Sequence, residues 1–127
     1  MDLVEAAREW LDVPFHHQGR NRVGIDCAGL VIVCAKELGI EFEDIKGYAR
    51  TPDGVTLERE LDRQLTKVKR EPISGDVLLM RIRREPQHIA IKTDIGIIHA
   101  YQGAGKVVEH NLDDKWRKRI KGVYSLG

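Results

Sequence analysis

The spacing of hydrophobic residues changes once along this 127-residue chain, near Gly75, from a helical period to a strand-like one. Before Gly75, apolar residues recur three and four positions apart, which is typical of amphipathic helices. After it, short apolar runs are separated by turns rich in Gly, Pro and Asp, which is typical of strands joined by hairpins. Helices followed by an antiparallel meander predict an α+β fold.

The pattern predicts three helices in the first half of the chain. The first covers residues 2–11, with its end set by Pro14. The second covers roughly residues 27–38 and stops at Gly39. The third runs over residues 56–68, where leucines follow each other at helical spacing.

The second half predicts an antiparallel sheet. The expected strands are residues 75–82, 88–92, 96–101, 106–110 and 123–126, with a charged turn at 83–87. Residues 113–121 are expected to form either a short basic helix or an irregular segment, and residues 40–54 a surface connection. A length of 127 residues is enough for one core, so we expect a single domain over residues 1–127.

Composition excludes several classes of partner. With 42% hydrophobic and 32% charged residues, the chain resembles an ordinary globular protein. A net charge of +1 predicts no nucleic-acid partner, and no apolar run is long enough for a membrane span. The acidic start Met1–Glu5 lacks the basic-then-apolar order of a signal peptide. We therefore expect synthesis in the cytoplasm without a secretion signal.

A cysteine stands at the start of the second predicted helix. Asp26 is a good N-cap, and Cys27 follows it in the first turn. The positive end of the helix dipole favours a thiolate there, and first-turn N–H groups can stabilise an oxyanion. Cys27 is therefore a candidate nucleophile, with a buried core cysteine as the alternative. Cys34 lies about 10 Å further along the axis, too far for a disulfide, and is expected in the core.

Two histidines on neighbouring predicted strands can serve a thiol nucleophile. His88 would take the proton from Cys27, and His99 would fix the tautomer of His88. This requires an even number of residues between the strands, because Ala90 then faces His99 and both rings lie on one face. An odd connection would separate the rings. His110, on a further strand, is a weaker alternative to His99.

Other histidines allow different interpretations. The polar loop at residues 15–24 leads into Cys27 and is expected to form a wall of a substrate cleft. His16 and His17 either line that cleft or are surface residues without a role. A zinc site is a third interpretation of the histidines and cysteines, but the chain has no tight ligand pair such as C-x-x-C or H-x-x-x-H.

Four segments resemble the NlpC/P60 cysteine peptidases, papain-like enzymes that cleave bacterial cell-wall peptides. These segments are Asp26–Val31, Gly75–Val77, His88–Ile91 and Ile98–Ala100, and the similarity in order and spacing runs from about Trp10 to Asn111. The stretch Pro14–Arg20 is similar to the branch found in bacteriophages, prophages and gene transfer agents, where the protein belongs to the tail.

The resemblance implies a set of roles. Cys27 matches the family nucleophile, His88 the base and His99 the third polar residue. Phe15 stands where the family commonly has a tyrosine thought to help at the oxyanion. The resemblance, together with the loop position, predicts oxyanion or substrate-binding roles for a second set of residues: Asp26, Phe15, His16 and His17. The implied reaction is hydrolysis of the amide between D-glutamate and a diamino acid in the peptidoglycan stem peptide. Nothing in this chemistry demands a cofactor, and we expect no metal.

A second hypothesis is a phage-tail structural or assembly protein with a decayed or incidental thiol site. Phe15 and the missing secretion signal motivate it. Either hypothesis allows other phage tail proteins as partners and a place in the virion. The basic segment 115–121 could contact anionic polymer or phospholipid, but a solvated charged face is the simpler interpretation.

Overall fold

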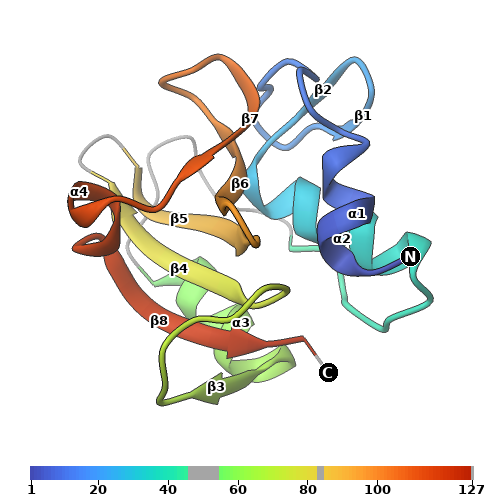
Figure 1. Ribbon diagram of the computed structural model, residues 1–127. Coiled ribbons are helices and arrows are strands. Elements are labelled where there is room, and N and C mark those ends of the chain that lie inside the picture. The colour runs from blue at the N-terminus through green and yellow to red at the C-terminus, as the bar shows by residue number, and fades with distance from the viewer. Residues whose placement is uncertain (46–54, 83–84, 127) are drawn as a thin grey trace.

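A computed structural model of the chain describes residues 1–45, 55–82 and 85–126. It has the α+β architecture that the change of period predicts (Figure 1). The helices are α1 (Leu3–Arg8), α2 (Cys27–Glu37), α3 (Thr56–Gln64) and α4 (Asp114–Arg117). The strands are β1 (Arg20–Asn21), β2 (Gly24–Ile25), β3 (Thr66–Val68), β4 (Val77–Ile82), β5 (Glu85–Lys92), β6 (Gly96–Tyr101), β7 (Lys106–Asn111) and β8 (Ile120–Ser125).

The main sheet has six strands in the order β3-β8-β4-β5-β6-β7, and all neighbouring pairs are antiparallel. Strands β4 to β7 form the predicted meander. The last strand, β8, returns across the sheet to lie between β3 and β4. β1 and β2 pair separately as a short hairpin, within a stretch that the sequence predicts only as a polar loop.

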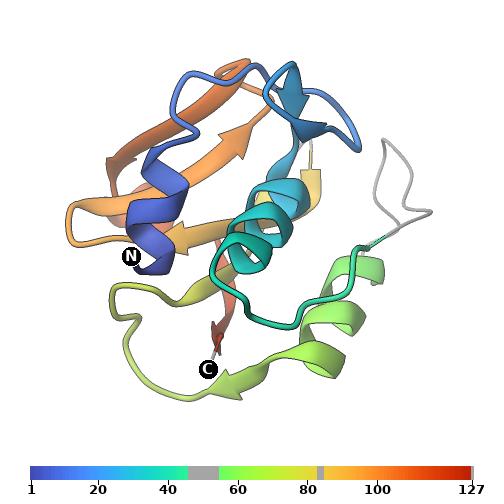
Figure 2. The same ribbon diagram turned by 90° about the vertical axis from the view of Figure 1, so that its right-hand side faces the viewer.

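Two groups of buried side chains cover the two faces of this sheet. Helices α1, α2 and α3 pack on one face, which Figure 2 views directly, and α4 lies on the other side (Figure 1). Along β5 the alternation is plain, since Ile89 and Ile91 pack with the helices and Ala90 packs on the α4 side. Ile97 and Trp116 also belong to the α4 side.

Some predicted boundaries of the N-terminal helix and the charged turn are wrong. α1 ends at Arg8 rather than at residue 11, and Leu11, within the predicted helix, is 39% exposed. β5 already begins at Glu85, within the stretch predicted as a turn, because Glu85 pairs with Ile82 of β4. Residues 83–84 of the predicted turn lie outside the described residues. Of the predicted surface connection at 40–54, residues 46–54 lie outside the described residues.

The third helix is also shorter than predicted. α3 ends at Gln64, and Leu65 is extended, with φ −120° and ψ 169°. Residues 66–68 instead form β3, whose Val68 pairs with Val123 of β8. The helical spacing of Leu65 and Val68 was misleading, because pairing with β8 gives residues 66–68 their backbone hydrogen bonds in an extended conformation.

A buried threonine organises the turn between β5 and β6. The Thr93 hydroxyl accepts hydrogen bonds from the backbone N–H groups of Ile95 (3.2 Å) and Gly96 (2.9 Å). Lys92 pairs with Ile97, so four residues connect the paired positions. This even number confirms the expected register and places position 90 opposite position 99.

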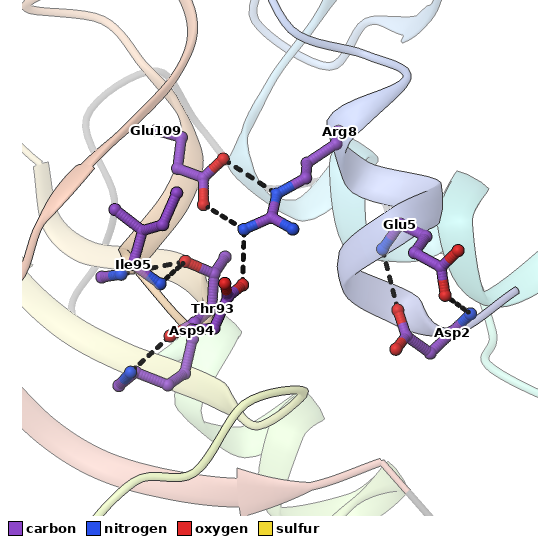
Figure 3. Close-up of polar contacts among 9 residues, drawn as sticks. Asp2, Glu5, Arg8, Thr93, Asp94, Ile95 and Glu109 are labelled. Carbon is purple, nitrogen blue, oxygen red and sulfur yellow. Dashed lines mark hydrogen bonds and ion pairs between the residues drawn. The ribbon is translucent and has the colours of Figure 1, made fainter.

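An arginine on α1 ties the helix layer to the sheet (Figure 3). The Arg8 guanidinium donates to both carboxylate oxygens of Glu109 on β7, at 3.0 and 2.8 Å, and to Asp94 at 2.6 Å. The Glu109 side chain is 10% exposed. The hydrogen bond from Arg8 lowers the pKa of Glu109, so the folded protein favours the carboxylate.

Glu109→Gln is expected to lower the free energy of unfolding by about 1 kcal/mol at pH 7, because one partner of a charge-assisted bidentate contact becomes neutral. A folded pKa below the unfolded value, about 4.3, means that this stabilisation is present above pH 4.3 and disappears as the pH falls. The difference between wild type and Glu109→Gln in urea denaturation should therefore shrink between pH 6 and pH 3. A difference that grows toward low pH would contradict this assignment.

Among the described residues, no helix is both long enough and apolar enough to cross a membrane.

Candidate active site

The predicted nucleophile stands at the first position of α2. Asp26 is the N-cap, and its carboxylate accepts a hydrogen bond from the Gly29 N–H at 2.8 Å. Cys27 is half-buried at the border of the helix-side core. Cys34 is fully buried, as expected, and burial raises its pKa to about 12, so its thiol stays protonated. The two cysteines are not joined by a disulfide.

Asp26 organises the loop that precedes the helix. Besides Gly29, its carboxylate accepts from the Gln18 N–H at 2.7 Å and from Arg20 Nη1 at 2.9 Å. Arg20 also donates to the Ile45 carbonyl at 3.1 Å. The carboxylate is 3% exposed. Asp26 therefore joins the loop to the first turn of α2, and Arg20 extends the contact to Ile45. A direct role of Asp26 in binding substrate stays a prediction.

Gly29 allows the loop to lie this close to the helix. A Cβ at this position would lie 2.4 Å from the carbonyl oxygen of Gly19 and 2.9 Å from Arg20 Nη1. Backbone atoms cannot yield to such a contact as the end of a flexible side chain can. The glycine in the first turn after Cys27 is thus required by the packing of the loop on α2.

The loop residues predicted to line a cleft lie beside this helix end. Phe15 is half-buried and forms a β-bridge with Ile25, directly before the N-cap. The backbone N–H of His16 donates to the Ile25 carbonyl at 3.1 Å, and the His16 side chain is exposed. His17 is half-buried. The main chain of Phe15 and His16 thus contacts Ile25, two residues before Cys27. The roles of Phe15, His16 and His17 toward a substrate stay predictions.

The two predicted imidazoles meet in the structure. His88 Nε2 lies 2.6 Å from His99 Nδ1, and both side chains are fully buried. Their rings meet edge to face, with centroids 4.9 Å apart. Because Ile91 pairs with Ile98, the two histidines are diagonal neighbours on one face of the sheet. This confirms that the strand register brings the rings together.

His99 is held neutral by its surroundings. Burial, followed by the neighbouring His88, His110 and Arg119, lowers the pKa of His99 far below its ordinary value. A neutral imidazole offers one donor and one acceptor, so His99 can orient His88 without competing for its proton.

The third strand histidine lies behind His99 and does not replace it. His99 Nε2 is 2.9 Å from His110 Nε2. His110 Nδ1 is in turn 2.9 Å from the carbonyl oxygen of Asn111. The alternative in which His110 contacts His88 in place of His99 is therefore wrong for this fold.

Two aromatic residues that the sequence analysis missed enclose these rings. Tyr101 stacks on His99 with centroids 5.1 Å apart and planes at 6°. Trp116 meets His99 edge-on at 5.1 Å, and Arg119 stacks over the indole at 4.4 Å. Tyr101 was discoverable, because it lies two residues after His99 on the same strand face. Trp116 was not, because it comes from α4.

The thiol and the histidines are carried by elements in contact. α2 packs against β5 and β6. His88 shares its face of β5 with Ala90, which is the α4 side of the sheet, whereas Cys27 lies at the border of the core on the helix side. Within the part of the chain that the structure describes, no group of three or more His, Cys, Asp or Glu side chains is arranged to hold a metal ion.

Solved structures with the same fold include several NlpC/P60 proteins. The NlpC/p60 domain of the peptidoglycan hydrolase SagA is 22% identical with a TM-score of 0.69, over 97% of this chain and 95% of that one. An NlpC/P60 family protein from Bacillus cereus ATCC 10987 is 20% identical with a TM-score of 0.70, over 96% of this chain and 38% of that one.

A third neighbour is described as similar to a lipoprotein of the NLP/P60 family, from Staphylococcus aureus subsp. aureus Mu50. It is 16% identical with a TM-score of 0.70, over 98% of this chain and 40% of that one. The chain thus spans about two fifths of these last two proteins. At these identities the likeness shows a shared fold.

No curated protein sequence matches the chain significantly. The profile of the NlpC/P60 family matches residues 12–125, which is nearly the whole chain and includes the cysteine helix and all three strand histidines. The protein is therefore a member of the NlpC/P60 family.

Proposed function

We propose that this protein is a thiol hydrolase that cleaves an amide bond in peptidoglycan stem peptides. The observation that carries the proposal is the 2.6 Å contact between His88 and His99, two buried histidines on strands that pack against the helix starting at Cys27. Family membership and a solved neighbour described as a peptidoglycan hydrolase support the substrate class.

In the proposed mechanism, His88 takes the thiol proton of Cys27. His88 uses Nε2 toward His99, so its buried Nδ1 is the nitrogen that receives the proton. The thiolate attacks the amide carbonyl, and the protonated His88 then gives its proton to the leaving amine. Water, activated by the same imidazole, hydrolyses the thioester and releases the acid and the thiol.

The oxyanion of the reaction needs hydrogen-bond donors, and the loop before Cys27 is one source of them. Phe15 has no hydroxyl to offer where the family commonly has a tyrosine. The backbone N–H of Cys27 is the proposed first donor, since it lies at the electropositive start of α2. We assign the second donor to the neighbouring loop, from His16 or His17.

The finer proposal concerns the bond and the setting. We infer cleavage between D-glutamate and the diamino acid, because the family resemblance of the cysteine and histidine segments points to it. We further propose that the protein acts as part of a phage or prophage tail, on the resemblance of Pro14–Arg20 to that branch. Immunolabelling of purified virions from a producing strain tests this location, and virions without the protein would refute it.

A digest of defined muropeptides tests the reaction. The wild-type protein is expected to cut the peptide into two fragments, which mass spectrometry identifies. One fragment ends in the freed carboxyl group of D-glutamate, and the other begins with a free amine on the diamino acid. Pretreatment with iodoacetamide should abolish cleavage, because the reagent can reach the partly exposed Cys27. Cys34 should not react, because it is fully buried and its pKa is raised. An intact muropeptide pool after incubation with untreated protein would reject the proposal.

The second candidate function is a structural tail protein with an inactive thiol site. The observation that favours it is Phe15, which lies beside Ile25 near the N-cap and lacks the hydroxyl of the tyrosine common at this position in the family. This function predicts that iodoacetamide labels Cys27 at pH 6 no faster than a model thiol, whereas a thiol activated by His88 should react clearly faster.

A further inference from the structure

Three imidazoles and one main-chain carbonyl form a continuous hydrogen-bonded chain across β5, β6 and β7. The successive contacts are His88 Nε2 to His99 Nδ1 at 2.6 Å, His99 Nε2 to His110 Nε2 at 2.9 Å, and His110 Nδ1 to the Asn111 carbonyl oxygen at 2.9 Å. The proposed hydrolysis uses only the first of these contacts. When all three rings are neutral, the last contact fixes the direction of the other two hydrogen bonds.

A carbonyl oxygen can only accept a hydrogen bond, so Nδ1 of His110 carries a hydrogen. When His110 is neutral, it presents a lone pair at Nε2, and His99 must donate to it from Nε2. His99 is neutral because burial and the adjacent imidazoles lower its pKa, which leaves Nδ1 as its acceptor. His88 must therefore donate from Nε2, and its own lone pair lies at Nδ1.

We propose that His110 is a positioning residue that, anchored by the Asn111 carbonyl, sets the tautomers of His99 and, through it, of His88. The catalytic consequence rests on the proposed function. If each of these hydrogen bonds ran in the opposite direction, the hydrogen of His88 would be on Nδ1. That nitrogen could then not take a proton from a thiol. The same direction also serves the protonated His88, because His99 Nδ1 remains an acceptor for it.

The fold holds His110 in this place. His110 pairs with Ile97 across β6 and β7, so it is a diagonal neighbour of His99 in the way that His88 is on the other side. Gly96 lets the strands approach, because a Cβ there would lie 2.1 Å from the His110 carbonyl oxygen. The Trp116 ring covers His110, with centroids 4.8 Å apart. The arrangement is thus built into the register.

Nuclear magnetic resonance of the ring nitrogens tests the assignment directly. In protein labelled with ¹⁵N-histidine, at a pH where the rings are neutral, long-range ¹H–¹⁵N correlations distinguish the two tautomers. The expected wild-type pattern is a hydrogen on Nε2 of His88, on Nε2 of His99 and on Nδ1 of His110. His110→Leu should mix the tautomers of His99 and His88, because the acceptor is gone.

His110→Gln should preserve them, because its side-chain oxygen can accept from His99. With a muropeptide substrate, His110→Leu is expected to lower kcat by roughly ten- to a hundredfold at unchanged KM, as for other outer partners of a reacting imidazole. His110→Gln should stay within about threefold of wild type. Lys106→Leu, an exposed change on the same strand, is the matched control and should alter neither readout.

A wild-type His99 with its hydrogen on Nδ1 overturns the assignment, and this measurement needs no variant to fold. Unchanged His99 and His88 tautomers in a folded His110→Leu also overturn it. If the tautomers respond as expected while no form of the protein cleaves muropeptides, the positioning role stands and the proposed hydrolysis fails.

Discussion

Cys27→Ala is expected to lower kcat for muropeptide cleavage by about 10⁴-fold or more, with little change in stability. The methyl group cannot form a covalent intermediate, and the remaining groups can only bind and polarise the substrate. The side chain is half-buried at the border of the core, so its removal leaves the packing of α2 intact. Product release followed by liquid chromatography measures the rate.

Cys34→Ala is the matched control on the same helix. Cys34 is fully buried and its raised pKa keeps it a neutral thiol, so this change should cost some stability and leave kcat within about twofold. Equal cleavage by Cys27→Ala and wild type would reject the nucleophile. Loss of activity in Cys34→Ala with an unaltered circular dichroism spectrum would shift the assignment to the other thiol.

His88→Gln is expected to lower kcat by about 10³-fold, which lies within the range for a lost general base. Glutamine can still donate to His99 from its amide nitrogen, so the buried contact at 2.6 Å has a replacement partner. It cannot take a proton near neutral pH. The rate of iodoacetamide labelling of Cys27 should therefore rise with pH as for an ordinary thiol, with a midpoint near about 8.5.

In the wild type Cys27 should be labelled faster than in His88→Gln at the same pH, because His88 can take the thiol proton. Arg81→Gln, an exposed change on the neighbouring strand β4, is the control and should leave both curves unchanged. Identical labelling curves for wild type and His88→Gln would show that His88 is not the base for this thiol.

Several features of the site were predictable because they depend on local or pairwise rules. Asp26 caps α2 since its carboxylate reaches the Gly29 N–H three residues on, and this geometry is written in the order of the residues. The contact of His88 with His99 follows from the parity of the Thr93–Gly96 connection. The helices and most strands likewise follow from hydrophobic spacing.

Other features depend on which segments meet. Residues 66–68 carry a helical pattern and become β3 because β8 lies beside them, and the pairing of these two strands is a long-range event. Trp116 contacts His99 and His110 because α4, which directly precedes β8 in the chain, packs on the sheet face that carries these two histidines. Local spacing carries no information about such partners.

The sequence alone determined that the chain begins with helices and ends in an antiparallel sheet, that a capped helix presents Cys27, and that an even turn can bring His88 and His99 to one face. Those outcomes rest on short-range hydrogen bonding and side-chain alternation. Only the tertiary structure decided that His110 stands behind His99, that Trp116 covers both, and that β8 divides β3 from β4. These depend on packing between segments far apart in the chain, where burial of apolar surface selects the partner and local propensity does not.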